Sequence, residues 1–94
     1  MKKLYPIGTV VLLKGANKRI MINGFLTIDG NDPNKVYDYN GVMYPEGCIS
    51  SDQTLLFDHE QIDKVYWIGY SDQENVEFMQ RLNEAWEEQN KKKK

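Results

Sequence analysis

Residue types that build disulfides, metal sites and rigid turns are scarce in this 94-residue chain, which has one Cys, one His and three Pro. A single Cys excludes an intrachain disulfide, and one Cys with one His supplies too few ligands for a typical zinc site. No apolar run reaches the roughly 18 residues that a membrane-spanning helix needs. The sequence therefore predicts a protein without metal, cofactor or membrane insertion.

Signals for export are also lacking. Lys2 and Lys3 stand near the N-terminus, but the apolar run Val10–Leu13 is far too short for the core of a signal peptide. A lone cysteine suits a reducing compartment, so we expect a cytoplasmic protein. Cys48 lies near Glu46 and Asp52 rather than near basic groups, which predicts a buried or half-buried structural thiol.

An excess of basic charge is absent as well, since the formal net charge is −2. Residues 58–90 carry nine acidic and two basic side chains, a net of −7. An acidic C-terminal third argues against a nucleic-acid footprint. The terminal Lys91–Lys94 run is expected to be a flexible tail after a single domain over residues 1–90.

Short strands are predicted in the first half. Ile7–Lys14 is apolar and β-branched, as in a buried strand, and a tight turn at 15–17 leads to a second strand over Lys18–Ile28. Asp29–Lys35 consists of turn-forming and solvated residues, which predicts an exposed loop.

The segment Val36–Tyr44 has two interpretations. Asn40-Gly41 is a strong signal for a two-residue hairpin turn, yet either arm alone is short for a hairpin. We favour one kinked strand. Beyond it, Asp58 and Gln61 predict the cap of a single helical turn, and Asp63–Tyr70 predicts the last strand.

An amphipathic helix is predicted at about 71–90. Ser71 is the expected N-cap, with Glu74 as its capping-box partner. An apolar stripe follows the 3.6-residue period: Val76, Phe78, Met79, Leu82, Ala85 and Trp86. Trp86 either packs within the chain or overhangs it to meet a partner.

Together these elements predict an α+β fold. Four or five short strands form a small, strongly bent antiparallel sheet, or an SH3-like, partly open barrel, and the C-terminal helix covers it.

A catalytic site is not predicted. His59 is flanked by Asp58 and Glu60, which would suit a general base, but no nucleophile is placed beside it. We expect an exposed turn residue and a protein that is not an enzyme.

Aromatic residues make up 12% of the chain, and their apolar bodies and polar tips suit both cores and contact surfaces. Covered by the helix, those on the strands would be core, which is the commoner outcome. Exposed, they would form a groove for a protein segment. The candidate partner-binding residues are Tyr37, Tyr39, Tyr44, Tyr66, Tyr70 and Trp86.

Three stretches carry a family resemblance: PIGTVVLLKGANKRIMING at 6–24, YDYNGVMYPEG at 37–47 and FDHEQIDKVYWIGY at 57–70. In this order they resemble the bacterial domain-of-unknown-function family numbered 4176, over residues 4 to about 82. The resemblance implies a protein of Gram-positive bacteria whose gene neighbours encode type VII secretion components and LXG-type toxins. No catalytic residues are implied.

The function that follows is a non-enzymatic protein-binding module. The resemblance implies an adaptor or chaperone-like accessory protein that binds an LXG-type toxin or a secretion component. The alternative is an immunity protein that neutralises a toxin domain, which the acidic C-terminal third would suit. Both a monomer and a homodimer are compatible with the sequence.

Overall fold

The computed structural model describes residues 4–50 and 54–92. They form five strands, one 3₁₀ turn and one helix, which are β1 (Val10–Leu13), β2 (Ile20–Asp29), β3 (Asp32–Met43), β4 (Leu55–Phe57), η2 (His59–Gln61), β5 (Ile62–Trp67) and α1 (Gln73–Lys92).

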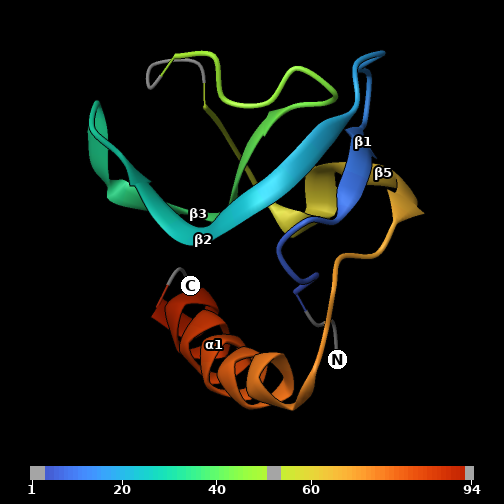
Figure 1. Ribbon diagram of the computed structural model, residues 1–94. Helices are drawn as coiled ribbons and strands as arrows, with labels where there is room; N and C mark the ends of the chain where they lie inside the picture. The colour runs from blue at the N-terminus through green and yellow to red at the C-terminus, as the bar shows by residue number, and fades with distance from the viewer. Residues whose placement is uncertain (1–3, 51–53, 93–94) are drawn as a thin grey trace.

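All strand pairs are antiparallel, and the order across the sheet is β4-β3-β2-β1-β5. The long strands β2 and β3 bend strongly, and α1 lies against one side of the sheet (Figure 1). The sheet does not close. The predicted α+β fold, a bent sheet with a C-terminal helix, is thus confirmed. Within the described residues, no helix is long and apolar enough to cross a membrane.

The β2–β3 connection is tighter than expected. Asp29 pairs with Asp32, so only Gly30 and Asn31 form the turn, and the predicted exposed loop Asp29–Lys35 is wrong. The ladder between the two strands extends through residues whose intrinsic preference is for turns, because pairing with a long neighbour outweighs local propensity.

Asn40-Gly41 lies inside β3 and is not a turn, which confirms the kinked-strand interpretation. Gly41 pairs with Ile22 on one side and Leu55 on the other. A Cβ atom on Gly41 would lie 2.6 Å from Cγ2 of Ile20 and 3.0 Å from the Met21 carbonyl oxygen. Glycine is therefore required here by close packing.

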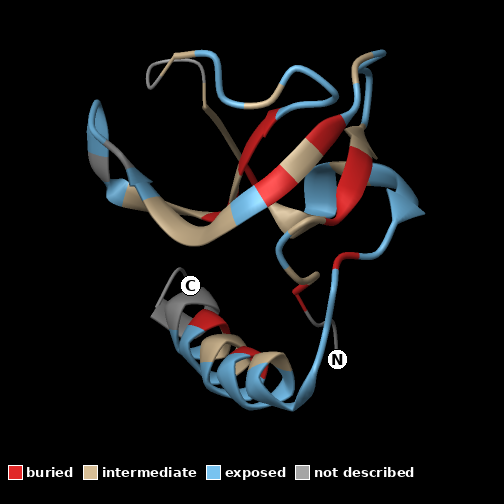
Figure 2. Cartoon of the chain, in the orientation of Figure 1, coloured by how far each residue is buried: buried red, intermediate tan, exposed pale blue. Residues whose placement is uncertain are grey.

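The core lies between the sheet and α1 (Figure 2). Its buried members are Leu4, Val11, Ile20, Ile22, Tyr39, Phe57, Met79 and Trp86. Tyr39 and Phe57 are the largest fully buried side chains, and their ring centroids lie 5.3 Å apart. Burial of such aromatic pairs is a main contribution to the stability of a small domain.

The start of α1 differs from the prediction by one residue. The Asp72 side chain, through Oδ1, accepts a hydrogen bond from the Asn75 backbone N–H at 2.9 Å, so Asp72 is the N-cap. Ser71 instead accepts a bond from the Asn75 side chain. A carboxylate satisfies the exposed N–H groups and also complements the positive end of the helix dipole.

The buried stripe of α1 is narrower than predicted. Met79 and Trp86 are buried and Leu82 is half-buried, whereas Val76, Phe78 and Ala85 are exposed. The helix extends to Lys92, two residues into the predicted lysine tail. Lys93 and Lys94 lie outside the described residues.

Candidate functional site

The candidate site is the edge strand β5 and the residues that follow it. Among the described strands, β5 pairs only with β1 and ends the sheet order. Its residues from Asp63 to Trp67 are all exposed, as Figure 2 shows. Exposed fractions are 52% for Tyr66, 69% for Trp67 and 51% for Ile68. A sheet edge that carries large apolar side chains is a template for another chain.

The pairing of β5 with β1 is short and irregular. Leu13 pairs with Ile62, Val11 with Val65 and Val10 with Trp67, with two register shifts along this short ladder. Such irregularities twist an edge strand and re-aim its side chains. Only Ile62 at the start of β5 is half-buried.

Tyr66 belongs to an aromatic cluster organised by Arg19. The Arg19 guanidinium carbon lies 5.8 Å from the Tyr66 ring centroid and 5.2 Å from that of Tyr44. Cation–π contacts of this kind hold a ring of β5 and a ring from the turn after β3 on one surface. The cluster is thus an ordered aromatic surface with one positive charge between its rings.

The chain leaves β5 through a fixed crossing at Gly69. A Cβ atom there would lie 2.0 Å from the Ile7 carbonyl oxygen, so only glycine fits. The Gly69 N–H donates to Oγ1 of the fully buried Thr9 at 3.1 Å, and that hydroxyl donates to the Pro6 carbonyl at 2.7 Å. These contacts fix the backbone at Gly69, while the side chains of Ile68 and Tyr70 on either side of it are exposed.

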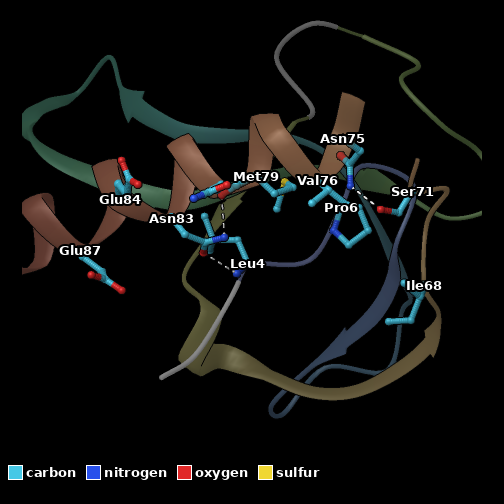
Figure 3. A pocket seen from close by; sticks show the side chains of 11 residues that line it. Leu4, Pro6, Ile68, Ser71, Asn75, Val76, Met79, Asn83, Glu84 and Glu87 are labelled. Atoms are coloured by element: carbon cyan, nitrogen blue, oxygen red, sulfur yellow. Dashed lines mark hydrogen bonds between the residues drawn. The ribbon is translucent and has the colours of Figure 1, made fainter. Parts of the chain in front are cut away.

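Beside the crossing lies a groove between α1 and the N-terminal segment, here called the α1 groove (Figure 3). Its volume is about 640 Å³. The lining residues are Leu4, Pro6, Ile68, Ser71, Asn75, Val76, Met79, Gln80, Asn83, Glu84 and Glu87. Ile68 is exposed and lies both next to β5 and in the groove wall, so the two features are continuous.

The predicted partner-binding residues separate into three groups: exposed, half-buried and buried. Tyr44, Tyr66 and Tyr70 are exposed, the last at 80%, and Arg19 brings the first two together. Tyr37 is half-buried beneath the Lys35 ammonium, whose pKa is raised by its hydrogen bond to Asp58.

Tyr39 and Trp86 are buried and present no surface to a partner. The Trp86 indole N–H donates to Oδ1 of Asp38 at 2.7 Å, while Oδ2 of Asp38 accepts the His59 backbone N–H at 2.8 Å. Trp86 therefore packs within its own chain, which answers the question that the helical stripe left open.

His59 is half-buried, so the expectation of an exposed turn residue is wrong. Its Nδ1 lies 2.7 Å from the Tyr39 hydroxyl, and its ring stacks on Tyr5 and Tyr39. The hydroxyl also accepts the Tyr5 backbone N–H. Burial, the largest cause, raises the pKa of Tyr39 well above its usual value of about 10, so the phenol stays neutral.

Metal ligands do not gather in the part of the chain that the structure describes, where no group of three or more His, Cys, Asp or Glu side chains is placed to hold an ion. Cys48 is exposed, contrary to the buried or half-buried thiol that was expected. It lies in the segment between β3 and β4, where Glu46 and Ile49 are also exposed.

Comparison with known families identifies one match: the family described as "Domain of unknown function (DUF4176)" matches residues 4–78. The chain belongs to this family. The resemblance read from the three sequence stretches is therefore confirmed. Comparisons with curated proteins and with solved structures find no match.

The family match covers the whole sheet and ends at Phe78, inside α1. Trp86 and the acidic end of the α1 groove lie beyond the matched residues. The exposed residues of β5, from Asp63 to Trp67, are here called the β5 surface, and all of them lie within the matched residues.

Sequence reasoning missed Arg19 and Ile68 as candidate site residues. Trp67 and Ile68 belong to the run VYWIGY, where apolar residues occupy both faces of a predicted strand. Such a run indicates either a strand buried on both faces or an edge strand with an exposed apolar side. Only the strand order distinguishes these two cases.

Proposed function

We propose that this protein is a non-enzymatic protein-binding module whose contact surface is centred on β5. The observation that carries the proposal is the run of exposed side chains on this edge strand, with Tyr66 and Trp67 more than half exposed. Tyr and Trp are the residues most enriched at the energetic centres of protein interfaces. Arginine is also enriched at these centres, and Arg19 lies beside Tyr66.

The biological setting that we propose is type VII secretion. The resemblance described above implies gene neighbours that encode LXG-type toxins and secretion components. The role proposed is an adaptor or chaperone-like protein that binds one of them in the cytoplasm. An edge strand suits this role, because main-chain pairing gives affinity while side chains give specificity.

The contacts of His59, the sole histidine, support the proposal that the protein is not an enzyme. His59 has its Nδ1 at the Tyr39 hydroxyl and its ring between other rings of the core. This arrangement fixes η2 against the sheet and α1. Its contacts are those of a structural residue.

Co-purification after co-expression with the neighbouring LXG-type protein tests the proposal. The wild-type chain is expected to form a stable complex, and the double variant Tyr66→Ser, Trp67→Ser is expected to lose it. Ile28→Ser is a matched control, because Ile28 is 54% exposed on β2, away from β5. Absence of a complex with the wild-type chain contradicts the proposal.

Immunity to a toxin is a second candidate, and the charge of α1 favours it. Five glutamates accompany a single arginine between Gln73 and Glu88, which suits a basic toxin domain. Cells that lack the gene should then be poisoned by their own toxin. Their survival beside active toxin rules this candidate out.

A further inference from the structure

The α1 groove has two chemically different ends. One end is apolar and formed by Pro6, Ile68 and Val76; the other carries Glu84 and Glu87 on successive turns of α1, as Figure 3 shows. Val76 and Ile68 are each about half exposed, at 53% and 51%. Two exposed apolar side chains thus lie at the opposite end of the groove from a pair of negative charges.

The acidic end is not neutralised within the described side chains. The ion pairs among them join Lys18 to Glu46 and Lys35 to Asp58, and none of these four residues lines the groove. Glu84 is exposed and Glu87 is half-buried, and neither carboxylate forms an ion pair with another described side chain. Two adjacent carboxylates beside an apolar surface attract a cation and disfavour an anion.

The floor of the groove is firmly held. The Leu4 backbone N–H donates to Oδ1 of Asn83 at 3.0 Å, and Nδ2 of Asn83 donates to the Met79 carbonyl at 2.7 Å (Figure 3). Leu4 and Met79 are both buried. A preformed groove lowers the ordering cost of binding a segment.

We propose that the α1 groove binds a short segment of a partner protein that combines one large apolar side chain with a nearby Lys or Arg. Val76 and Glu87 are eleven positions apart on α1, which is about 16 Å along a helix. An extended segment covers that distance in about five residues. The apolar residue and the cation are therefore about five positions apart in the bound segment.

A second copy of this chain is a poorer occupant. In a two-fold contact the same patch meets itself, and the groove lining holds no basic side chain that could pair with Glu84 and Glu87 of the other copy. The inference rests on the proposed function, and it extends the β5 surface through Ile68. It adds the charge and spacing of the partner segment.

Peptide titration followed by amide NMR shifts tests the inference on the full chain. The probes are 12-residue peptides with one Leu and one Arg five positions apart in a Ser/Gly background, and matched peptides with Glu in place of Arg. The Arg peptides are expected to shift the amides of Ile68, Val76, Glu84 and Glu87, and the Glu peptides are not. Binding should weaken as salt rises.

The second part of the test reverses the charge of the two glutamates in the groove. Glu84→Lys with Glu87→Lys is expected to weaken the Arg peptides by about tenfold. Glu77→Lys with Glu88→Lys changes the net charge equally at exposed sites outside the groove and should leave binding within about twofold. Equal weakening by both variants, or equal shifts with both peptides, overturns the inference.

Two further outcomes separate this inference from the proposed function. If the LXG-type protein binds the wild-type chain and the Glu84→Lys, Glu87→Lys variant equally well, the groove inference fails while the β5 proposal stands. If sedimentation shows a dimer that Val76→Asp dissociates, the occupant is a second copy and the inference is wrong. A monomer that binds the Arg peptides supports it.

Discussion

Asp38 joins three elements through one buried carboxylate. It lies on β3, accepts the backbone N–H of His59 in η2 and accepts the indole N–H of Trp86 in α1. Nothing in the local sequence predicts this, because Asp38 and Trp86 are 48 positions apart. The helical period correctly indicated an apolar stripe, but its polar partner on the sheet depends on the tertiary fold.

Removal of the indole N–H should therefore destabilise the protein. Trp86→Phe leaves Oδ1 of Asp38 buried without that donor, which is expected to cost about 1–3 kcal/mol of unfolding free energy. Trp67→Phe makes the same chemical change at a 69% exposed site and should alter stability by less than about 0.5 kcal/mol. Urea unfolding of both variants measures the difference; equal effects would contradict the buried network.

Because Tyr39 is buried, we expect the protein to lose stability at alkaline pH. Burial raises its pKa in the folded state, so its contribution is fully present below about pH 10 and is lost as pH rises from there toward the folded pKa. Between pH 10 and 12 the wild type should lose up to about 1.4 kcal/mol per pH unit more than Tyr39→Phe.

The control for this pH dependence is Tyr70→Phe, since Tyr70 is 80% exposed. Its urea midpoint should follow that of the wild type across the same pH range. If Tyr39→Phe also follows the wild type, Tyr39 does not titrate as a buried group.

Among the elements, β3 shows how far local signals reach. The period-2 alternation correctly predicted a strand through Val36–Tyr44, and the short arms correctly argued against a turn at Asn40-Gly41. The reason for Gly41 was beyond the sequence, because it depends on Ile20, Met21 and Phe57 from neighbouring strands. The same holds for β5, whose existence was predictable but whose edge position follows from the strand order.

Gly41→Ala should destabilise the sheet by about 1–3 kcal/mol, since the added methyl group would press on Ile20 and on the Met21 carbonyl. Gly30→Ala is the matched control, because a Cβ atom there meets nothing within 4 Å. Thermal unfolding followed by circular dichroism distinguishes the two. An unchanged midpoint for Gly41→Ala would show that the sheet adjusts freely.

In the whole molecule, the core and the proposed contact surface are made of different residues. Tyr39, Phe57 and Trp86 stabilise the interior, while Tyr66, Trp67 and Ile68 face outward on and after β5. The aromatic residues of the sequence are therefore divided between the interior and an exposed surface, and this division was not predictable from the sequence. That division requires knowledge of which strand has a free edge.

Amide hydrogen exchange tests the central claim most directly, by comparing the chain alone with the chain saturated by the LXG-type protein. A partner that adds to the sheet edge should slow exchange at residues 62–68, with little change in the β2–β3 hairpin. The Tyr66→Ser, Trp67→Ser variant should lose this protection. Binding that protects other residues and leaves β5 exchanging as in the free chain would contradict the claim that β5 is the contact surface.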